Sequence, residues 1–213
     1  MADLSSARDR LIARLSLEIS DKRVIEAMRR VPREAFVPQE LCYAAYEDRP
    51  LSIGFGQTIS QPYIVALMVQ ALQLESKDKV LELGAGSGYE AAVLAELARE
   101  VITIERIPEL ADGARRVLQQ LGYSNVKVYP AGRELGWTDG APYDAVVVSA
   151  GAPCVPQALL EQLSPGGRLV IPVGSRWQQD LLKVTKRKKT NKVENLGGCY
   201  FVPLIGEGAW EEE

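Results

Sequence analysis

A glycine-rich turn near the middle of the chain carries the clearest chemistry in this sequence. The mainly apolar residues 80–83 lead into three glycines at alternate positions, Gly84, Gly86 and Gly88. Glycines at this spacing let the backbone turn sharply and leave its N–H groups free to face a ligand. We therefore predict a strand, a tight turn and a helix around a nucleotide-sized site.

The same turn departs from the dinucleotide-binding pattern. Gly-x-Gly-x-x-Gly requires glycine at position 89, where Tyr89 stands, and Gly88 comes one residue early. Glu82, an acid near the end of the strand, suits a ligand with an ammonium group better than one with a pyrophosphate. These features disfavour a classical NAD or FAD site and point to S-adenosylmethionine.

A second carboxylate supports an adenosyl ligand. Glu105 ends the apolar segment 101–105, 21 residues after Gly84. Folds of this kind place the acid that accepts both ribose hydroxyls about 20 residues after the turn. Either feature alone also fits an empty turn or a solvated acid at an exposed strand end. Together, at this spacing, they favour an adenosyl-binding site.

A polar loop over residues 52–63 contains a serine that permits two interpretations. Ser60 followed by Pro62 is a good start for a helix, so the hydroxyl fits an N-cap. A hydroxyl beside free N–H groups at a helix N-terminus also makes a site for a carboxylate. On spacing alone the N-cap is favoured.

The composition is that of an ordinary globular protein. The 213 residues include 46% hydrophobic and 25% charged residues, with a formal net charge of −3. An acidic chain lacks the overall positive charge that would indicate binding to nucleic acid. No apolar run approaches the roughly 18 residues that can span a bilayer. We expect neither a nucleic-acid nor a membrane partner.

Cysteine and histidine usage narrows the chemistry further. Cys42, Cys154 and Cys199 are odd in number and widely spaced, which fits neither a disulfide framework nor a metal cluster. This usage indicates a reducing compartment, and the charged start of the chain does not resemble a signal peptide. We therefore expect a cytoplasmic protein. Because the chain contains no histidine, imidazole can be neither its general base nor a metal ligand.

Hydrophobic spacing predicts the elements that position these residues. The segments 4–19 and 21–31 read as helices, with Ser20 as N-cap of the second. From residue 79 onward strands and helices alternate, with strands over 79–84, 100–105, 126–130, 143–149 and 167–173 and helices over 88–98, 108–121 and 155–163. Such alternation predicts an α/β fold with a doubly wound, mostly parallel sheet that binds its ligand at the carboxyl ends of the strands.

The last part of the chain has a different pattern. Segments 181–185 and 199–204 read as strands that flank a polar turn, which predicts an antiparallel pair. The basic run 186–189 then forms a solvated hairpin tip rather than a nucleic-acid patch. We expect an N-terminal helical region with its loop over residues 1–78 and a ligand-binding core over 79–213, together one compact domain.

Over about residues 20–205 the chain closely resembles the protein-L-isoaspartate O-methyltransferase family. The loop GQTIS at 56–60 is particular to that family, whereas the glycine-rich turn marks only the methyltransferase fold. The matching segments are GQTIS (56–60), LELGAGSGY (81–89), AAVLA (91–95), IER (104–106), LGYSNV (121–126), APYD (141–144), GGRLVIPVG (166–174) and FVPL (201–204).

The resemblance implies a fold and an activity. The fold is that of the class I S-adenosylmethionine-dependent methyltransferases, a Rossmann-like seven-stranded sheet with an N-terminal helical appendage and an antiparallel C-terminal pair. The activity passes a methyl group from S-adenosylmethionine to the free carboxylate of isoaspartyl residues in proteins and peptides, leaving S-adenosylhomocysteine. A carboxylate with a pKa near 4 is already ionised at neutral pH, so it needs no base. The implied partner is an isoaspartyl protein, and we expect a monomer without a metal.

The resemblance also implies site residues. Ser60 is the family's active-site serine, which reverses the preference for a simple cap. The substrate would contact Thr58, Ile59 and Val202. The residues implied to bind the cofactor are Gln57, Thr58, Tyr63, Glu82, Gly84, Ala85, Gly86, Ser87, Glu105, Arg106, Gly132 and Arg133.

Two departures from the family pattern leave alternatives open. The chain has Ala131-Gly132-Arg133 where the family usually has Gly-Asp-Gly, so an aspartate that would meet the adenine amino group is missing. Tyr63 stands where the family often has histidine. A homologue that binds the cofactor but has weak or no isoaspartyl activity, docking a partner through its N-terminal helices, is one alternative.

A different methyltransferase is the other alternative. Pro153-Cys154 imitates the nucleophile of cytosine-C5 methyltransferases, but the chain is acidic and has no target-recognition domain. Amino-methylating enzymes tend to carry Asn or Asp followed by Pro-Pro at this strand end, and residues 149–152 do not match.

Overall fold

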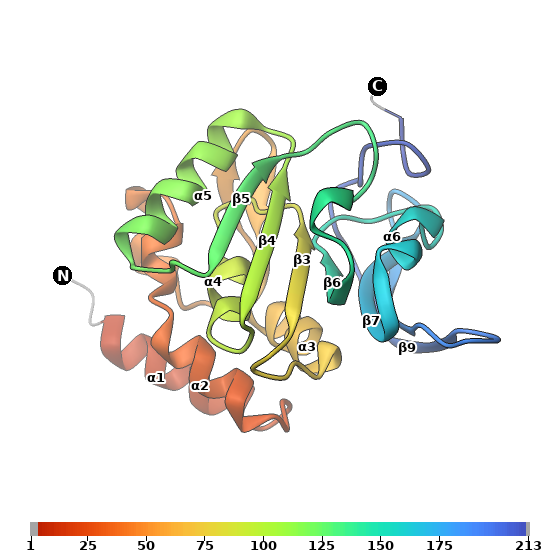
Figure 1. Ribbon diagram of the computed structural model, residues 1–213. Coiled ribbons are helices and arrows are strands. Elements are labelled where there is room, and N and C mark those ends of the chain that lie inside the picture. Colours follow the sequence, from red (N-terminus) through yellow and green to blue (C-terminus); the bar gives the residue numbers. More distant parts are fainter. Residues whose placement is uncertain (1–3, 212–213) are drawn as a thin grey trace.

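The computed structural model describes residues 4–211 and contains one central seven-stranded sheet (Figure 1). The strand order is β5-β4-β3-β6-β7-β8-β9. β3 to β7 are parallel, and β8 and β9 join as an antiparallel extension. The strands are β3 (Lys79–Leu83), β4 (Glu100–Glu105), β5 (Val126–Pro130), β6 (Tyr143–Val148), β7 (Leu163–Gly174), β8 (Gln179–Thr185) and β9 (Lys192–Cys199). The predicted α/β class and mostly parallel sheet are confirmed.

Helices cover both faces of this sheet. They are α1 (Leu4–Leu15), α2 (Lys22–Arg30), α3 (Pro62–Leu72), α4 (Tyr89–Ala95), α5 (Pro108–Gln120) and α6 (Gln157–Glu161). Shorter elements are the 3-10 turns η1 (Arg33–Phe36), η2 (Gln39–Ala44) and η3 (Thr138–Gly140), and a hairpin of β1 (Leu51–Gly54) and β2 (Gln57–Ile59). No helix within residues 4–211 is long and apolar enough to cross a membrane.

Alternate residues of the strands build two cores. Val80 and Val101 face the core shared with α1 to α5, while Leu81 and Ile102 face the core shared with α6 and the segment around Leu135. Burying one such leucine contributes about 1.5–3 kcal/mol. The period-two alternation of buried residues on both faces holds the strands in register and therefore fixes where their carboxyl ends lie.

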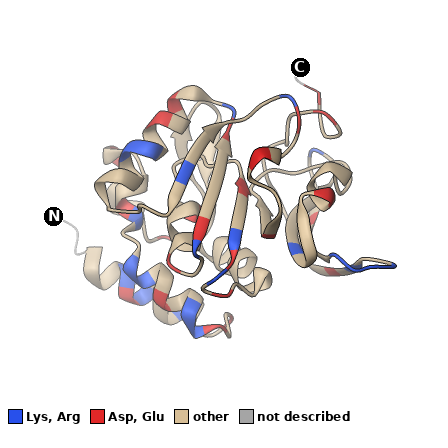
Figure 2. Cartoon of the chain, viewed as in Figure 1, with Lys and Arg blue, Asp and Glu red and all other residues tan. Residues whose placement is uncertain are grey.

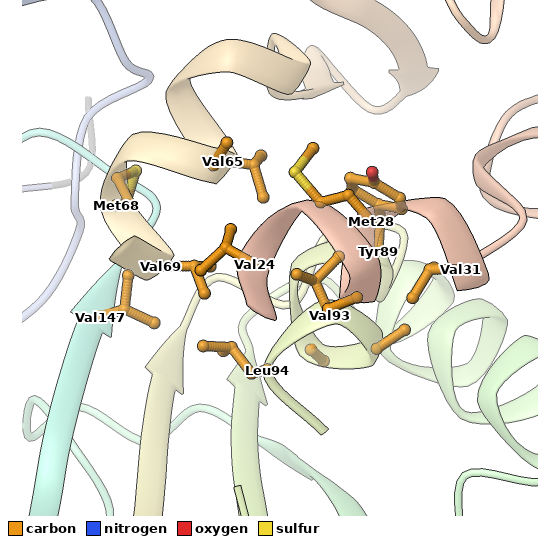
Figure 3. Packing of buried hydrophobic residues seen from close by; sticks show 14 of the residues in the cluster. Val24, Met28, Val31, Val65, Met68, Val69, Tyr89, Val93, Leu94 and Val147 are labelled. Atoms are coloured by element: carbon orange, nitrogen blue, oxygen red, sulfur yellow. The ribbon is translucent and has the colours of Figure 1, made fainter. Parts of the chain in front are cut away.

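The N-terminal helices are part of the larger core. Figure 3 shows Val24 and Met28 of α2 packed among Val65 of α3, Val93 of α4 and Val147 of β6. Lys and Arg outnumber Asp and Glu along α1 and α2, as Figure 2 shows. These two helices therefore present a mainly basic, solvated outer face and an apolar inner face.

Several of the predicted boundaries are wrong, among them the start of β7, which is Leu163 rather than residue 167, and the end of α4, which is Ala95 rather than residue 98. Helix α1 ends at Leu15 rather than residue 19, and α6 covers only 157–161 of the predicted 155–163. The N-cap of α2 is Asp21, whose side chain accepts from the backbone N–H of Arg23, whereas the Ser20 hydroxyl donates to Gln70. Asp21 also accepts from the Arg23 side chain, an additional contact that a serine hydroxyl could not match.

Two segments have a different structure from the one predicted. Residues 52–59, predicted as loop, form most of the β1–β2 hairpin, which reverses through Gly54, Phe55 and Gly56 at positive φ. The last strand is 192–199 rather than 199–204, and residues 200–204 instead cross the carboxyl end of the sheet. The basic run 186–189 does lie at the turn between β8 and β9, as predicted.

Candidate active site

A cavity of about 940 Å³ opens at the carboxyl ends of β3, β4 and β6. Its floor is the glycine-rich turn, and its walls are the β1–β2 hairpin, the segment after β5 and residues 198–205. Sites for nucleosides and similar ligands typically measure about 300–1,000 Å³. The cavity therefore has the size and position that the sequence predicts.

The glycine-rich turn is anchored to the neighbouring strand. The backbone N–H groups of Gly84 and Ala85 both donate to the carbonyl of Ile104, at 2.9 and 3.2 Å. Gly88 adopts a φ of 89°, and a Cβ there would lie 3.2 Å from side-chain atoms of α5. The third glycine thus allows both the turn and the close approach of α5.

Glu105 holds this turn from the end of β4. Its carboxylate accepts from the backbone N–H of Gly86 at 2.8 Å and from that of Ile107 at 2.9 Å. The side chain is only 6% exposed, so the expectation of an exposed strand end is wrong. Glu105 lines the cavity and also holds its floor in place.

Two further acids lie at the cavity, and neither forms an ion pair with a Lys or Arg side chain among the residues that the structure describes. Glu82 is 0% exposed, and neither of its carboxylate oxygens has a hydrogen-bond partner among the described residues. Glu90, in the first turn of α4, accepts from the Ser149 hydroxyl at 2.6 Å, while its Oε1 has no partner. Sequence reasoning predicted Glu82 but missed Glu90 and Ser149.

Burial dominates the electrostatics of this pair. It raises the pKa of Glu82 well above its usual range, and repulsion from Glu90 raises it further. Burial raises the pKa of Glu90 to about 7, against the opposing effect of the Ser149 hydrogen bond. Unpartnered buried carboxyl groups are costly, so this end of the cavity is suited to a ligand that carries positive charge.

Ser60 lines the cavity between the hairpin and α3. The N-cap of α3 is Gln61, and it makes no side-chain capping bond, so the predicted N-cap role of Ser60 is wrong. Pro62 at the first helical position has no N–H to cap, which removes one of the usual donors. The Ser60 hydroxyl makes no hydrogen bond with any residue that the structure describes.

Arg33 holds the backbone of Ser60. It is 0% exposed and donates from Nη2 to the Ser60 carbonyl at 2.8 Å and from Nε to the Ala45 carbonyl at 2.9 Å. Its guanidinium lies 4.6 Å from the ring centre of Tyr89, the first residue of α4. One buried side chain thus connects the hairpin exit, the segment after η2 and the helix that follows the glycine-rich turn.

The last wall comes from the C-terminal part of the chain. Gly151 donates to the carbonyl of Val202 and accepts from the N–H of Leu204, both at 2.8 Å. Phe201 donates its N–H to the Gln179 side chain at 2.8 Å. These bonds hold Val202 against the cavity, as part of the segment that the sequence suggested was a strand.

The cavity brings together most of the predicted site residues. Those that line it are Gln57, Thr58, Ile59, Ser60, Glu82, Gly84, Ala85, Gly86, Ser87, Glu105, Arg106, Gly132 and Val202. Tyr63 does not; its backbone N–H donates to Asp48 at 2.9 Å in the first turn of α3. Arg133 lines a neighbouring cavity of about 330 Å³ instead.

Two other chemistries find no support at this site. Cys154 is exposed and does not line the cavity, so it is not placed as a nucleophile. Within residues 4–211 no group of three or more His, Cys, Asp or Glu side chains could hold a metal ion.

The chain is similar to one family in sequence and in fold. A family model described as protein-L-isoaspartate(D-aspartate) O-methyltransferase matches residues 7–209. Protein-L-isoaspartate O-methyltransferase 1 of Syntrophobacter fumaroxidans is 54% identical over 213 residues, which is 99% of this chain and 100% of the relative.

Two solved structures agree with this similarity. A protein-L-isoaspartate O-methyltransferase matches with a TM-score of 0.84 and 28% identity, over 95% of this chain and 67% of the other. A Plasmodium falciparum structure described as a β-aspartate methyltransferase in complex with S-adenosyl-L-homocysteine matches with a TM-score of 0.80 and 24% identity, over 95% and 98% of the two chains.

Proposed function

Because this chain belongs to the protein-L-isoaspartate(D-aspartate) O-methyltransferase family, we propose that its cavity binds S-adenosylmethionine beside the free carboxylate of an isoaspartyl residue. The chain is an S-adenosylmethionine-dependent protein carboxyl O-methyltransferase. One observation carries the assignment of the site: the family's own loop, residues 56–60, lines the same cavity as Glu82, whose carboxylate oxygens have no hydrogen-bond partner among the described residues.

The residues of the cavity fit this cofactor. Glu105 lies at the end of β4, beside the turn, where it can accept ribose hydroxyls with its remaining lone pairs. The unpartnered carboxyl group of Glu82 suits an ammonium group. Gly132 lines the cavity on the wall after β5, and the family resemblance implies the adenine contact at this position. When bound, S-adenosylmethionine supplies a methyl group activated by the attached sulfonium.

The hairpin side of the cavity is proposed to hold the substrate. The free hydroxyl of Ser60 can donate to the isoaspartyl carboxylate, and Thr58 and Ile59 lie beside it on β2. Arg33 fixes the Ser60 backbone, so the hydroxyl is positioned by a buried contact rather than by a mobile loop. Val202 lines the cavity from the wall formed by residues 198–205.

Positioning accounts for the chemistry of these residues. The substrate carboxylate is ionised at neutral pH and needs no base, which agrees with a chain that has no histidine. Holding two reacting groups in line can supply roughly 7–11 kcal/mol of the barrier. In the methyl ester so formed, the neighbouring amide nitrogen attacks the ester carbonyl, the bond to the methoxy group breaks and methanol leaves, which closes a succinimide without further help from the protein.

We further propose that the chain acts as a cytoplasmic monomer without a nucleic-acid or membrane partner. The net charge of −3 and the three widely spaced cysteines support this. None of the three cysteines forms a disulfide in the structure.

The decisive test is methyl incorporation. We expect labelled S-adenosylmethionine to transfer its methyl group to a peptide with one isoaspartyl link and not to the same peptide with a normal aspartyl link. Base-labile label in the isoaspartyl peptide alone would support the function, because methyl esters hydrolyse readily in base. Equal labelling of both peptides, or of neither, would overturn it.

A further inference from the structure

Glu90 is a buried acid at the cavity that the proposed chemistry does not yet use. It is 6% exposed and lines the cavity from the first turn of α4. The sequence gives it an ordinary position, because acids are common in the first turn of a helix. Its surroundings are less ordinary, since it faces a second buried acid, Glu82.

The groups around Glu90 come from several elements. Glu82 of β3 and Glu105 of β4 line the same cavity as Glu90. In addition to burial, repulsion from both Glu90 and Glu105 raises the pKa of Glu82, while the Thr103 hydroxyl on β4 lowers it. Ser149, just after β6, donates its hydroxyl to Glu90 Oε2. Arg33 lies over the ring of the adjacent Tyr89, but its Nε and Nη2 donate to the carbonyls of Ala45 and Ser60. Within residues 4–211 no ion pair joins Glu82 or Glu90 to a Lys or Arg side chain.

This arrangement cannot hold two full negative charges without compensation. Three of the four carboxylate oxygens of Glu82 and Glu90 have no hydrogen-bond partner among the described residues. Two adjacent carboxyl groups away from water share a proton rather than both ionise. A cation brought into the cavity replaces that proton as the compensating charge.

We propose that Glu90, oriented by Ser149, forms with Glu82 a proton-sharing pair that binds the ammonium group of the methyl donor and releases a proton when the donor enters. The inference rests on the proposed function, because that function supplies a ligand with an ammonium group. The O–H bond of the shared proton breaks, the proton passes to solvent, and no other covalent bond changes. Burial, which raises the pKa of both groups, keeps the pair protonated near neutral pH until the cation arrives.

Calorimetry of S-adenosylhomocysteine binding tests this directly, without turnover. Titrations at one pH in two buffers of different ionisation enthalpy give the net number of protons exchanged. We expect binding to release a proton. Where a full proton is released, the dissociation constant should fall by up to about tenfold for each unit by which the pH is raised. Methylthioadenosine, which lacks the amino-acid part, should bind without this release.

Two variants should change the release in opposite directions. Glu90→Gln keeps an acceptor for Ser149 but removes one charge. The number of protons released on binding should therefore decrease, most clearly near pH 8. Ser149→Ala removes the hydrogen bond that favours ionised Glu90. Because Glu90 then stays protonated at higher pH, proton release on binding should continue to higher pH. Glu109→Gln is the matched control, because Glu109 is an exposed acid in the first turn of α5; its profile should equal that of the unchanged protein.

The outcomes separate the two proposals. If S-adenosylhomocysteine does not bind at all, the proposed cofactor assignment fails. If it binds with no proton release, or if Glu90→Gln and the unchanged protein give the same profile from about pH 6 to 8, the proton-sharing pair is overturned while the function stands.

Discussion

Ser60 lies one residue before the N-cap of α3, and its hydroxyl is free of hydrogen bonds to the described residues. No cap is lost on substitution, so Ser60→Ala and Ser60→Gly should each change the free energy of unfolding by less than about 0.5 kcal/mol. If the hydroxyl orients the substrate carboxylate, both should lower methyl transfer by a similar factor, on the order of a hundredfold.

Urea unfolding and turnover on an isoaspartyl peptide measure the two effects of the Ser60 variants. Ser124→Ala, in the exposed turn between α5 and β5, is the control and should alter neither quantity. A Ser60→Gly protein with near-normal turnover would rule out the catalytic assignment.

Gly132 offers a second test at the residue scale. It is exposed, and a Cβ there would meet nothing within 4 Å, so a side chain can be added without strain. Gly132→Asp restores the family's residue on the cavity wall and should tighten S-adenosylhomocysteine binding by about tenfold, the worth of one charge-assisted hydrogen bond. Gly132→Ala is the control, because it stiffens the backbone as Gly132→Asp does but adds no carboxylate. Equal dissociation constants for Gly132→Asp and the unchanged protein would show that no adenine contact is missing.

The sequence indicated some of these residues and not others for a physical reason. Glu82 and Glu105 sit at strand ends beside a glycine-rich turn, where local spacing is enough to predict a ligand. The contact between Ser149 and Glu90 joins residues 59 positions apart and depends on how β6 lies beside β3. Such a pair has no local sequence signal.

At the scale of elements, η1 acts on the site through one side chain. Arg33 donates to the Ser60 carbonyl, and a lysine there could not reach both that carbonyl and the Ala45 carbonyl in the same geometry. We expect Arg33→Lys to lower the free energy of unfolding by about 1–3 kcal/mol. It should also lower kcat for methyl transfer while leaving the dissociation constant of S-adenosylhomocysteine within about twofold, because Arg33 does not line the cavity.

A purely structural role for Arg33 predicts a different result. Turnover per folded molecule would then be unchanged in Arg33→Lys, as judged by active-site titration with S-adenosylhomocysteine. That result would remove Arg33 as a positioning residue for Ser60.

The alternation of strands and helices from residue 79 to 174 was predictable mainly because β3, β4 and β6 are buried on both sides and read as apolar runs. The β1–β2 hairpin was not, since its strands have only four and three residues and are largely exposed. Strand β9 is an edge strand with five of its eight residues exposed, so it carries little apolar signal. The apolar residues 201–204 misled the prediction because they are buried against the sheet end without forming a strand of the sheet.

At the scale of the whole molecule, the buried acids predict how stability depends on pH. Burial raises the pKa of Glu90 to about 7 and that of Glu82 above its usual range. The folded protein therefore holds more protons than the unfolded chain above the ordinary glutamate pKa of about 4.3. The stabilising contribution is complete below that value and is lost as the pH rises through about 7.

We accordingly expect the Tm of the ligand-free protein to fall relative to that of Glu90→Gln as the pH is raised from about 5 to 8. Scanning calorimetry of both proteins at matched ionic strength measures the difference, which cancels titrations common to both. A difference that stays constant over this range would contradict the raised pKa of Glu90.

The wall formed by residues 198–205 determines when, during synthesis of the chain, the cavity can be complete. This segment begins at the end of the last strand, β9, yet it lines a cavity whose other side, residues 56–60, is made much earlier in the chain. During translation the early segments leave the ribosome first and can begin to fold. A nascent or prematurely terminated chain that ends before residue 198 therefore has the glycine-rich turn and Ser60 but an open cavity. We therefore expect methyl transfer only from chains whose synthesis has passed that segment.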